Sequence, residues 1–493
     1  MGRKEMPEKI LRALISFSCL APVRGVGKKL SYNKSILPRG EVVERVCQRV
    51  MDFYAERKVE SALVSRTAKT YQGIYFRNQI KTIKEKLADE TFEAPALREK
   101  LNNRLARYRK EKEELSSCDG PKETIAFLAR YYAEDIAADF EPAFFSIFKH
   151  MAYKLFPNFA SSIQISENGD GTFEAIRKLM WEAPVLFMPN HISNADHIPI
   201  CMTLNQMRLP QPRIAVGANL FRGISAVLLS RVNGYKIRRE YVGQSEGVLG
   251  GIKWFQNPVY KHVHTEYLKQ GWDNNEPLMF YIEGTRSRDG SLGKPKLGIL
   301  GDALEYAKET GRTLYVVPIS ISYSIVPEDK DIEASRKGEN ISHKDLLSQL
   351  RGMDRGFKKY ASGGIHLRFS PPVALNAETK SLSSFAGDVM ETISSEVVTM
   401  TTSALAASIL KVKHKTLTGR TFHLSDLMDD FISLLDKRIA GKGTPEDQLN
   451  GAVDIFKGRG FIKDTGNGEA FELLDEPLIL QYANRIAHRV DWL

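Results

Sequence analysis

The chain has 493 residues, of which 42% are hydrophobic and 26% are charged, an ordinary composition for a globular protein with a sizeable core. Its net charge of +10 admits nucleic acid, an anionic membrane surface or phosphorylated substrates, or only a mildly basic surface. Four cysteines without a CxxC pair argue against a disulfide framework, and no apolar segment is long enough to predict a membrane span.

The N-terminal stretch "ILRALISFSCLAPV" (10–23) is the most apolar segment. Its apolar residues share a broad helical face, which fits a helix lying in a membrane interface or, equally, one packed on the protein's own core. No signal-peptide cleavage pattern follows it.

Residues 40–160 have the apolar spacing of helices, and we expect a helical N-terminal region over 1–165. Within it, 96–117 is charged nearly all round, as in a solvent-exposed helix or hairpin arm. The turn cluster "SENGDGT" (166–172) predicts a boundary.

Short apolar strands alternate with helical stretches over 166–380. The predicted strands are 184–189, 213–218, 235–239, 277–283, 313–321 and 365–371. The alternation predicts an α/β domain with a mixed, largely parallel sheet flanked by helices. Ligands of such sheets bind beyond the carboxyl ends of the strands.

The region 381–493 is expected to be helical again. Residues 444–473 read as a helix followed by a small hairpin, a pattern compatible with a winged-helix fragment. The sequence offers no recognition helix rich in Arg, Asn or Gln there.

The stretch "PVLFMPNHISNADHIPIC" (184–201) places His191, Asp196 and His197 just after a predicted strand. A metal site is disfavoured because no second ligand cluster stands out downstream. An acid/base pair fits better: neutral His191 can take a proton from an alcohol while Asp196 stabilises the imidazolium. The alternative is a polar turn in which Ser193 or Asn194 caps the next helix.

Two further basic clusters also follow predicted strands, in "YKIRRE" (235–240) and "FYIEGTRSRDGSLGKPKLGIL" (280–300). Arginines at this density suit bidentate binding of phosphate, and Gly284 lets the backbone approach a ligand. Individually, each arginine reads more simply as a surface residue paired with Glu240 or Asp289.

The blocks "HISNAD", "IRR", "EGTRSR…KPKLG" and "VPISISY" occur in this order, and the sequence here resembles the glycerol-3-phosphate and dihydroxyacetone-phosphate acyltransferases, the HX4D glycerolipid family. The resemblance covers about residues 140–330 and extends weakly to "ILQYANRIAHRV" near the C-terminus. Lys236 departs from the family, which usually carries two aromatic residues before "IRR".

The resemblance implies that His191 is the general base and Asp196 its orienting carboxylate. It implies that Pro318 and the segment to Tyr323 shape the acyl-donor site. The residues expected to contact substrates are Arg238, Arg239, Glu283, Gly284, Thr285, Arg286, Ser287, Arg288, Lys294, Lys296 and Pro318.

The implied reaction moves a fatty acyl group from acyl-CoA or acyl-carrier protein, as co-substrate, to the sn-1 hydroxyl of glycerol 3-phosphate or dihydroxyacetone phosphate. We expect no metal and no cofactor, and a peripheral enzyme on the cytoplasmic side of a membrane. The alternatives are a lysophosphatidate acyltransferase, an inactive acyltransferase-like scaffold, and a basic nucleic-acid-binding protein. The arginines argue against nucleic acid because they lie at strand ends rather than along one exposed helix.

Overall fold

The computed structural model describes residues 37–88, 95–221, 223–238, 241, 257–339, 346–360, 363–416, 420–438, 443–466 and 468–490. The apolar stretch 10–23 and Arg239 lie outside the described residues, so the expectations for them stay predictions.

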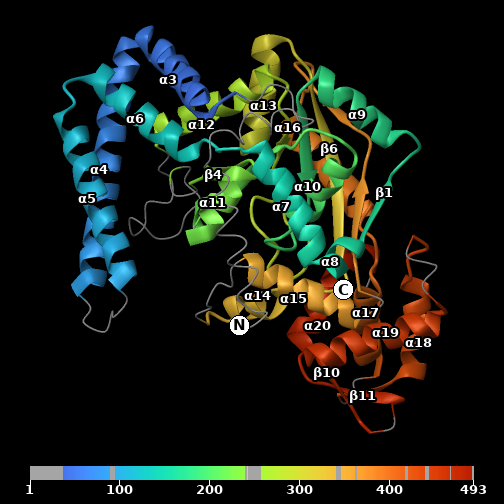
Figure 1. The fold of residues 1–493 in the computed structure, drawn as a ribbon. Coiled ribbons are helices and arrows are strands. Elements are labelled where there is room, and N and C mark those ends of the chain that lie inside the picture. The colour runs from blue at the N-terminus through green and yellow to red at the C-terminus, as the bar shows by residue number, and fades with distance from the viewer. Residues whose placement is uncertain are drawn as a thin grey trace.

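A mixed sheet forms the centre of the molecule, with the strand order β1-β7-β6-β2-β5-β3-β4 and β8 paired to β6 (Figure 1). Its strands are β1 (Ile163–Glu167), β2 (Val185–Pro189), β3 (Arg213–Gly217), β4 (Gly234–Ile237), β5 (Leu278–Met279), β6 (Leu314–Tyr323), β7 (Ile365–Phe369) and β8 (Val373–Leu375). The strands β6, β2, β5, β3 and β4 run parallel, whereas β7 and β8 are antiparallel to β6.

All six predicted strands are present, and the predicted fold class is confirmed. The strand expected over 277–283 is shorter, because the ladder includes only Leu278 and Met279 before the chain turns toward the site. The sequence did not predict β1 or β8; β1 continues through Glu167, past the expected boundary at 165. The three-part division of the chain stays a prediction.

Two helical layers cover the two faces of the sheet. A hydrophobic core lies between each layer and the sheet, and successive side chains of β2 point into alternate cores. Val185 and Phe187 belong to the first core, and Leu186 and Met188 belong to the second. The second core includes α3 (Arg39–Ala55), α4 (Lys58–Ala88), α5 (Pro95–Ser117), α6 (Pro121–Ile136), α12 (Pro258–Asp273), α13 (Gly298–Thr310) and α16 (Leu382–Ser395). Each β2 side chain is thus buried whichever way it points, as in a parallel sheet covered on both faces.

The first core lies against the other face and joins the helices that flank the sheet to those of the C-terminal region. Its helices are α7 (Pro142–Leu155), α8 (Pro157–Ser161), α9 (Thr172–Glu182), α10 (His197–Gln206), α11 (Gly223–Arg231), α14 (Asp329–Arg336), α15 (Leu346–Lys359), α17 (Thr401–Thr416), α18 (Leu424–Leu434), α19 (Pro445–Arg459) and α20 (Glu476–Ala483). Short 3-10 turns, η1 (Ala218–Leu220) and η3 (Asn484–Arg489), complete the set.

The helix and hairpin expected over 444–473 are α19 and the antiparallel pair β10 (Ile462–Asp464) and β11 (Ala470–Leu473). A third strand, β9 (Thr421–His423), pairs with β11 and gives the order β10-β11-β9. Gly460 ends α19 with a φ of 75°, a left-handed conformation that glycine adopts without steric strain.

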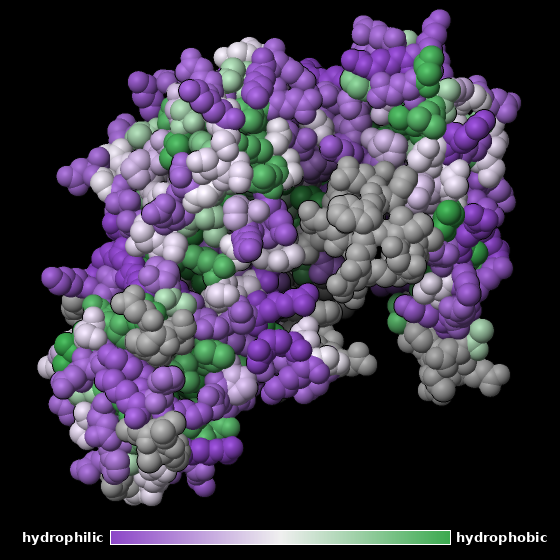
Figure 2. Space-filling model, turned by 180° about the vertical axis from the view of Figure 1, so that it is seen from behind, coloured by the Kyte–Doolittle hydropathy of each residue, from purple (hydrophilic) through white to green (hydrophobic). Residues whose placement is uncertain are grey.

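The helices α4 and α5 pack against each other and extend away from the main body, as Figure 1 shows at the left. From behind, in Figure 2, the surface of this pair is mostly hydrophilic. The prediction of a solvent-exposed hairpin arm over 96–117 is therefore confirmed. No helix in the described part of the chain is both long and apolar enough to cross a membrane.

Candidate active site

His191 and Asp196 lie together at the carboxyl end of β2. The Nδ1 atom of His191 is 2.9 Å from Oδ2 of Asp196, which also accepts the backbone N–H groups of Ile192 and Ser193 at 2.8 and 2.9 Å. Asp196 is fully buried, and the His191 side chain is 14% exposed. Because the carboxylate accepts a hydrogen from Nδ1, the neutral imidazole keeps its free lone pair on Nε2.

The imidazole of His191 also stacks on the phenol ring of Tyr281, with ring centroids 3.8 Å apart and planes inclined by 10°. Tyr281 follows β5, so a neighbouring strand supplies one wall for the ring. Burial, and next the charge of Asp196, raise the pKa of Tyr281 well above its ordinary value, so the phenol stays protonated. The sequence analysis did not single out Tyr281.

Glu283 joins the His191 loop to the loop that follows β5. Its Oε1 accepts the N–H of His191 at 2.8 Å and its Oε2 accepts the N–H of Gly293 at 2.7 Å. The N–H of Ser287 donates to the carbonyl of His191 at 2.9 Å. Both carboxylate oxygens of Glu283 thus bind backbone N–H groups, which joins the two loops; its expected contact with a substrate stays a prediction.

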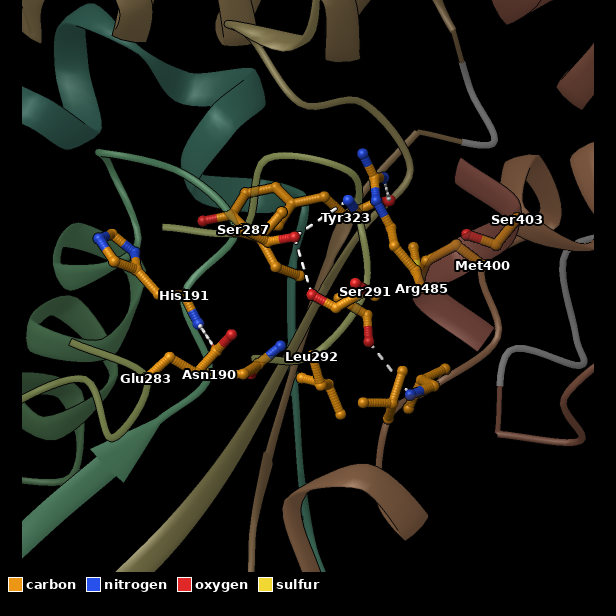
Figure 3. Close-up of a pocket in the computed structure, with 15 residues that line it drawn as sticks. Asn190, His191, Glu283, Ser287, Ser291, Leu292, Tyr323, Met400, Ser403 and Arg485 are labelled. Atoms are coloured by element: carbon orange, nitrogen blue, oxygen red, sulfur yellow. Dashed lines mark hydrogen bonds between the residues drawn. The ribbon is translucent and has the colours of Figure 1, made fainter. Parts of the chain in front are cut away.

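Figure 3 shows Glu283 in a small pocket of mixed polar and apolar lining beside Asn190 and His191; Ser287, Tyr323 and Arg485 also line it. The Ser287 hydroxyl donates to the carbonyl of Ser291 at 2.8 Å. The pocket volume of about 10 Å³ suffices for one water molecule. Of the residues expected to contact substrates, Glu283 and Ser287 line this pocket.

A second, larger cavity of about 690 Å³ opens beside His191. Of the residues predicted to contact substrates, it brings together Gly284, Thr285, Arg286, Arg288 and Lys296. Apolar side chains from β3 and its surroundings line it as well, including Ile214, Val216 and Phe280. The cavity thus combines cationic and apolar side chains at the carboxyl edge of the parallel strands, where the strand-end argument predicted a site, and Asp302 and Glu305 of α13 also line it.

Other predicted residues lie elsewhere. Pro318 is buried within β6, opposite Met188 of β2, and Lys294 is exposed but does not line the cavity. Arg238 lies under α6, where its Nη2 donates to Asp135 at 3.0 Å and its Nη1 to the hydroxyl of Tyr75 at 3.1 Å.

Asp135 explains why Lys236 stands where the family usually carries an aromatic residue. The Nζ atom of Lys236 lies 2.6 Å from Oδ1 of Asp135, so one carboxylate on α6 binds both basic residues of β4 and its end. Asp135 lies about a hundred residues before β4, which is why the pattern around "YKIRRE" alone could not reveal it.

His197 was considered as a metal ligand, and the structure places it on α10, 8% exposed. Burial lowers its pKa to about 4. Within the described ranges, no three His, Cys, Asp or Glu side chains come together as a metal site would require.

Residues 170–322 match the family model described as Acyltransferase. The chain is 29% identical over 228 residues to dihydroxyacetone phosphate acyltransferase of Bos taurus, covering 45% of this chain and 31% of that protein. It is 24% identical over 362 residues to glycerol-3-phosphate acyltransferase of Pseudoalteromonas atlantica, covering 68% of this chain and 41% of that protein. The chain thus spans less than half the length of these curated relatives.

Among solved structures, the chain is similar to the 1-acyl-sn-glycerophosphate (LPA) acyltransferase PlsC of Thermotoga maritima. The identity is 14%, the match covers 51% of this chain and 77% of that one, and the TM-score is 0.29. The family resemblance predicted from the four sequence blocks is confirmed by the family model and the curated relatives.

Proposed function

We propose, from the premise that residues 170–322 form a domain of the Acyltransferase family, that this chain transfers a fatty acyl group to glycerol 3-phosphate or dihydroxyacetone phosphate. The observation that carries the proposal is one cavity in which His191, oriented by Asp196, faces a wall containing Arg286, Arg288 and Lys296. A base and a set of phosphate-binding cations are what acylation of a phosphorylated alcohol needs.

In the proposed reaction, Nε2 of His191 takes the proton of the acceptor's sn-1 hydroxyl as that oxygen attacks the carbonyl carbon of an acyl thioester. The tetrahedral intermediate collapses, the C–S bond breaks, and the thiolate receives the proton from the imidazolium. Asp196 stabilises the imidazolium between these two transfers, and a positioned base of this kind contributes about 10²- to 10⁴-fold in rate.

The cationic wall would hold the acceptor's phosphate and so orient the hydroxyl toward the thioester, which lowers the entropic part of the activation barrier. The apolar wall suits the alkyl part of the donor. The donor would be acyl-CoA or an acyl-carrier protein, used as a co-substrate without a metal or cofactor.

The lipid product and the net charge of +10 support an enzyme bound peripherally to the cytoplasmic side of a membrane. Flotation with anionic liposomes at low salt tests this placement, with neutral liposomes as the control. Protein that stays in the soluble fraction with both would contradict it.

The reaction is tested by transfer of a labelled palmitoyl group from palmitoyl-CoA in mixed micelles. Glycerol 3-phosphate, dihydroxyacetone phosphate and lysophosphatidate are compared in parallel, with folded His191→Ala as the blank. A His191-dependent product with either of the first two supports the proposal. Product with lysophosphatidate alone would mean that lysophosphatidate, and not the proposed acceptor, is the substrate. No product, with acyl-carrier protein tried as the second donor, would refute it.

A further inference from the structure

Glu328 is a buried carboxylate that belongs to none of the clusters recognised in the sequence. It follows β6 in the stretch "IVPED" (325–329), directly before α14, and only 3% of its surface is exposed. A carboxylate this buried requires compensating partners, because removing its charge from water is unfavourable.

The partners of Glu328 come from both halves of the candidate site. On the side of the base, Oε1 accepts the N–H of Asn194 at 2.6 Å, and the two carboxylate oxygens lie 3.1 and 3.0 Å from the hydroxyl of Ser193. On the side of the cations, Oε1 accepts Nη1 of Arg286 at 3.0 Å. One carboxylate therefore joins the loop between His191 and Asp196 to an arginine of the phosphate wall.

The buried charge of Glu328 is compensated both by the arginine and by the loop. Burial raises the pKa of Glu328, and the charge of Arg286 is the largest opposing effect. The Arg286 side chain is 24% exposed and lines the cavity. A guanidinium has five N–H donors, so the bond from Nη1 to Glu328 leaves donors for a ligand.

We propose that Glu328 is a positioning residue for the phosphorylated acceptor, which fixes Arg286 at a set place relative to His191. It does so without contacting the substrate. The inference rests on the proposed function, since it assigns Arg286 to the acceptor's phosphate.

Glu328→Gln tests this directly, because glutamine keeps the shape and an oxygen for the Asn194 N–H but loses the negative charge. We expect the KM for the acceptor to rise about ten- to a hundredfold, the range for loss of one charge-assisted hydrogen bond. The KM for the acyl donor should stay within about twofold of wild type. A change in general stability would not separate the two substrates in this way.

Glu333→Gln is the matched control. Glu333 lies on α14, the helix that Glu328 precedes, and is also 3% exposed; it binds Arg336 at 2.9 Å and Gln481 at 3.2 Å rather than the His191 loop or Arg286. It should leave both KM values unchanged. A rise in the acceptor KM as large as that of Glu328→Gln would overturn the proposal, since the effect would then be one of helix stability.

A double-mutant cycle with Arg286→Ala gives the second readout. If Glu328 acts through Arg286, Glu328→Gln should change the acceptor KM by less than about twofold in the Arg286→Ala background. Full additivity of the two changes would overturn the proposal. If the glutamine variant does not fold, Glu328→Asp is used instead, because aspartate keeps the charge but cannot keep all three contacts. Glu328→Asp should raise the acceptor KM severalfold and leave the donor KM unchanged.

Failure of this inference and failure of the proposed function give different results. A wild-type enzyme that acylates the acceptor, together with a Glu328→Gln variant of unchanged acceptor KM, overturns the role of Glu328 alone. A folded wild-type protein that neither turns over nor binds glycerol 3-phosphate by calorimetry overturns the proposed function and this inference with it.

Discussion

The ring of Tyr281 lies nearly parallel to the imidazole of His191, 3.8 Å away between centroids, while Asp196 binds the same imidazole at Nδ1. The ring plane and one ring nitrogen are thus fixed by two different loops. The hydroxyl of Tyr281 is buried and has no hydrogen-bond partner among the described residues. The stacking face, and not the hydroxyl, is therefore the part of Tyr281 that bears on the base.

This predicts different effects for two substitutions of Tyr281. Tyr281→Phe keeps the stack and removes an unpaired buried hydroxyl, so kcat should stay within about twofold and the free energy of unfolding should rise by about 1 kcal/mol. Tyr281→Ala frees the imidazole, and kcat should fall by about ten- to a hundredfold. Steady-state kinetics and urea unfolding measure both; equal activity in the two variants would contradict the prediction.

Asp196→Asn should remove most of the activity while the protein stays folded. The amide cannot stabilise an imidazolium as a carboxylate does, so kcat should fall by about 10²- to 10⁴-fold. Turnover and the far-ultraviolet circular dichroism spectrum are compared with wild type. Near-normal kcat in a folded Asp196→Asn variant would remove Asp196 from the proposed mechanism.

The sequence predicted well what depends on short stretches of chain. The apolar run before His191 predicted β2, and the strand-end rule placed His191 and Arg286 at one edge of the sheet. Contacts between distant segments were not predictable in this way. Glu328 and Asp135 each stand beside another acidic residue, Asp329 and Glu134, and nothing in the sequence distinguishes them; their importance comes only from what the fold brings beside them.

Arg238 is a residue that the sequence predicted to lie in the site and that the structure places elsewhere. Its place beside Ile237 at the end of a strand predicted a phosphate contact, but the residue is held by Asp135 of α6 and Tyr75 of α4. A charge count within "YKIRRE" could not show this, because the neutralising carboxylate comes from the N-terminal helical layer. The same carboxylate accounts for a lysine where the family usually carries an aromatic residue.

Asp135→Ala should therefore destabilise the protein strongly. It leaves Lys236 and Arg238 partly buried without their carboxylate, and breaking such a pair lowers the free energy of unfolding by about 3 kcal/mol or more. The matched control is Glu44→Ala, which breaks the ion pair with Arg130 between side chains that are 62% and 50% exposed. Glu44→Ala should lower the free energy of unfolding by less than about 1 kcal/mol. Equal effects in urea unfolding would contradict the assignment.

Lys294 and Lys296 allow a test of the cavity wall within one short segment. Lys296 lines the cavity and Lys294 does not, although both are exposed. Lys296→Ala should raise the acceptor KM about tenfold through loss of one phosphate contact, while Lys294→Ala should leave it within about twofold. Initial rates over a range of acceptor concentrations measure this. A larger effect at Lys294 would place the phosphate outside the cavity described here.

Asp302, on α13, predicts a dependence of stability on pH. Burial raises its pKa from 3.8 to about 6, partly opposed by a hydrogen bond from Thr265. Between about pH 4 and pH 6 the folded state therefore binds more protons than the unfolded state, so this residue makes the free energy of unfolding fall as pH rises through that window. Above the window its unfavourable contribution is constant.

Asp302→Asn removes the charge that burial disfavours. The variant should match wild type in stability near pH 4 and exceed it by about 1–3 kcal/mol at pH 7.5, measured by urea unfolding at both values. Glu305, one turn along the same helix, also raises the pKa of Asp302 by its charge, so it is left unchanged in both proteins. An Asp302→Asn variant that is less stable than wild type at pH 7.5 would mean that the ionised carboxylate has a favourable partner in the folded protein.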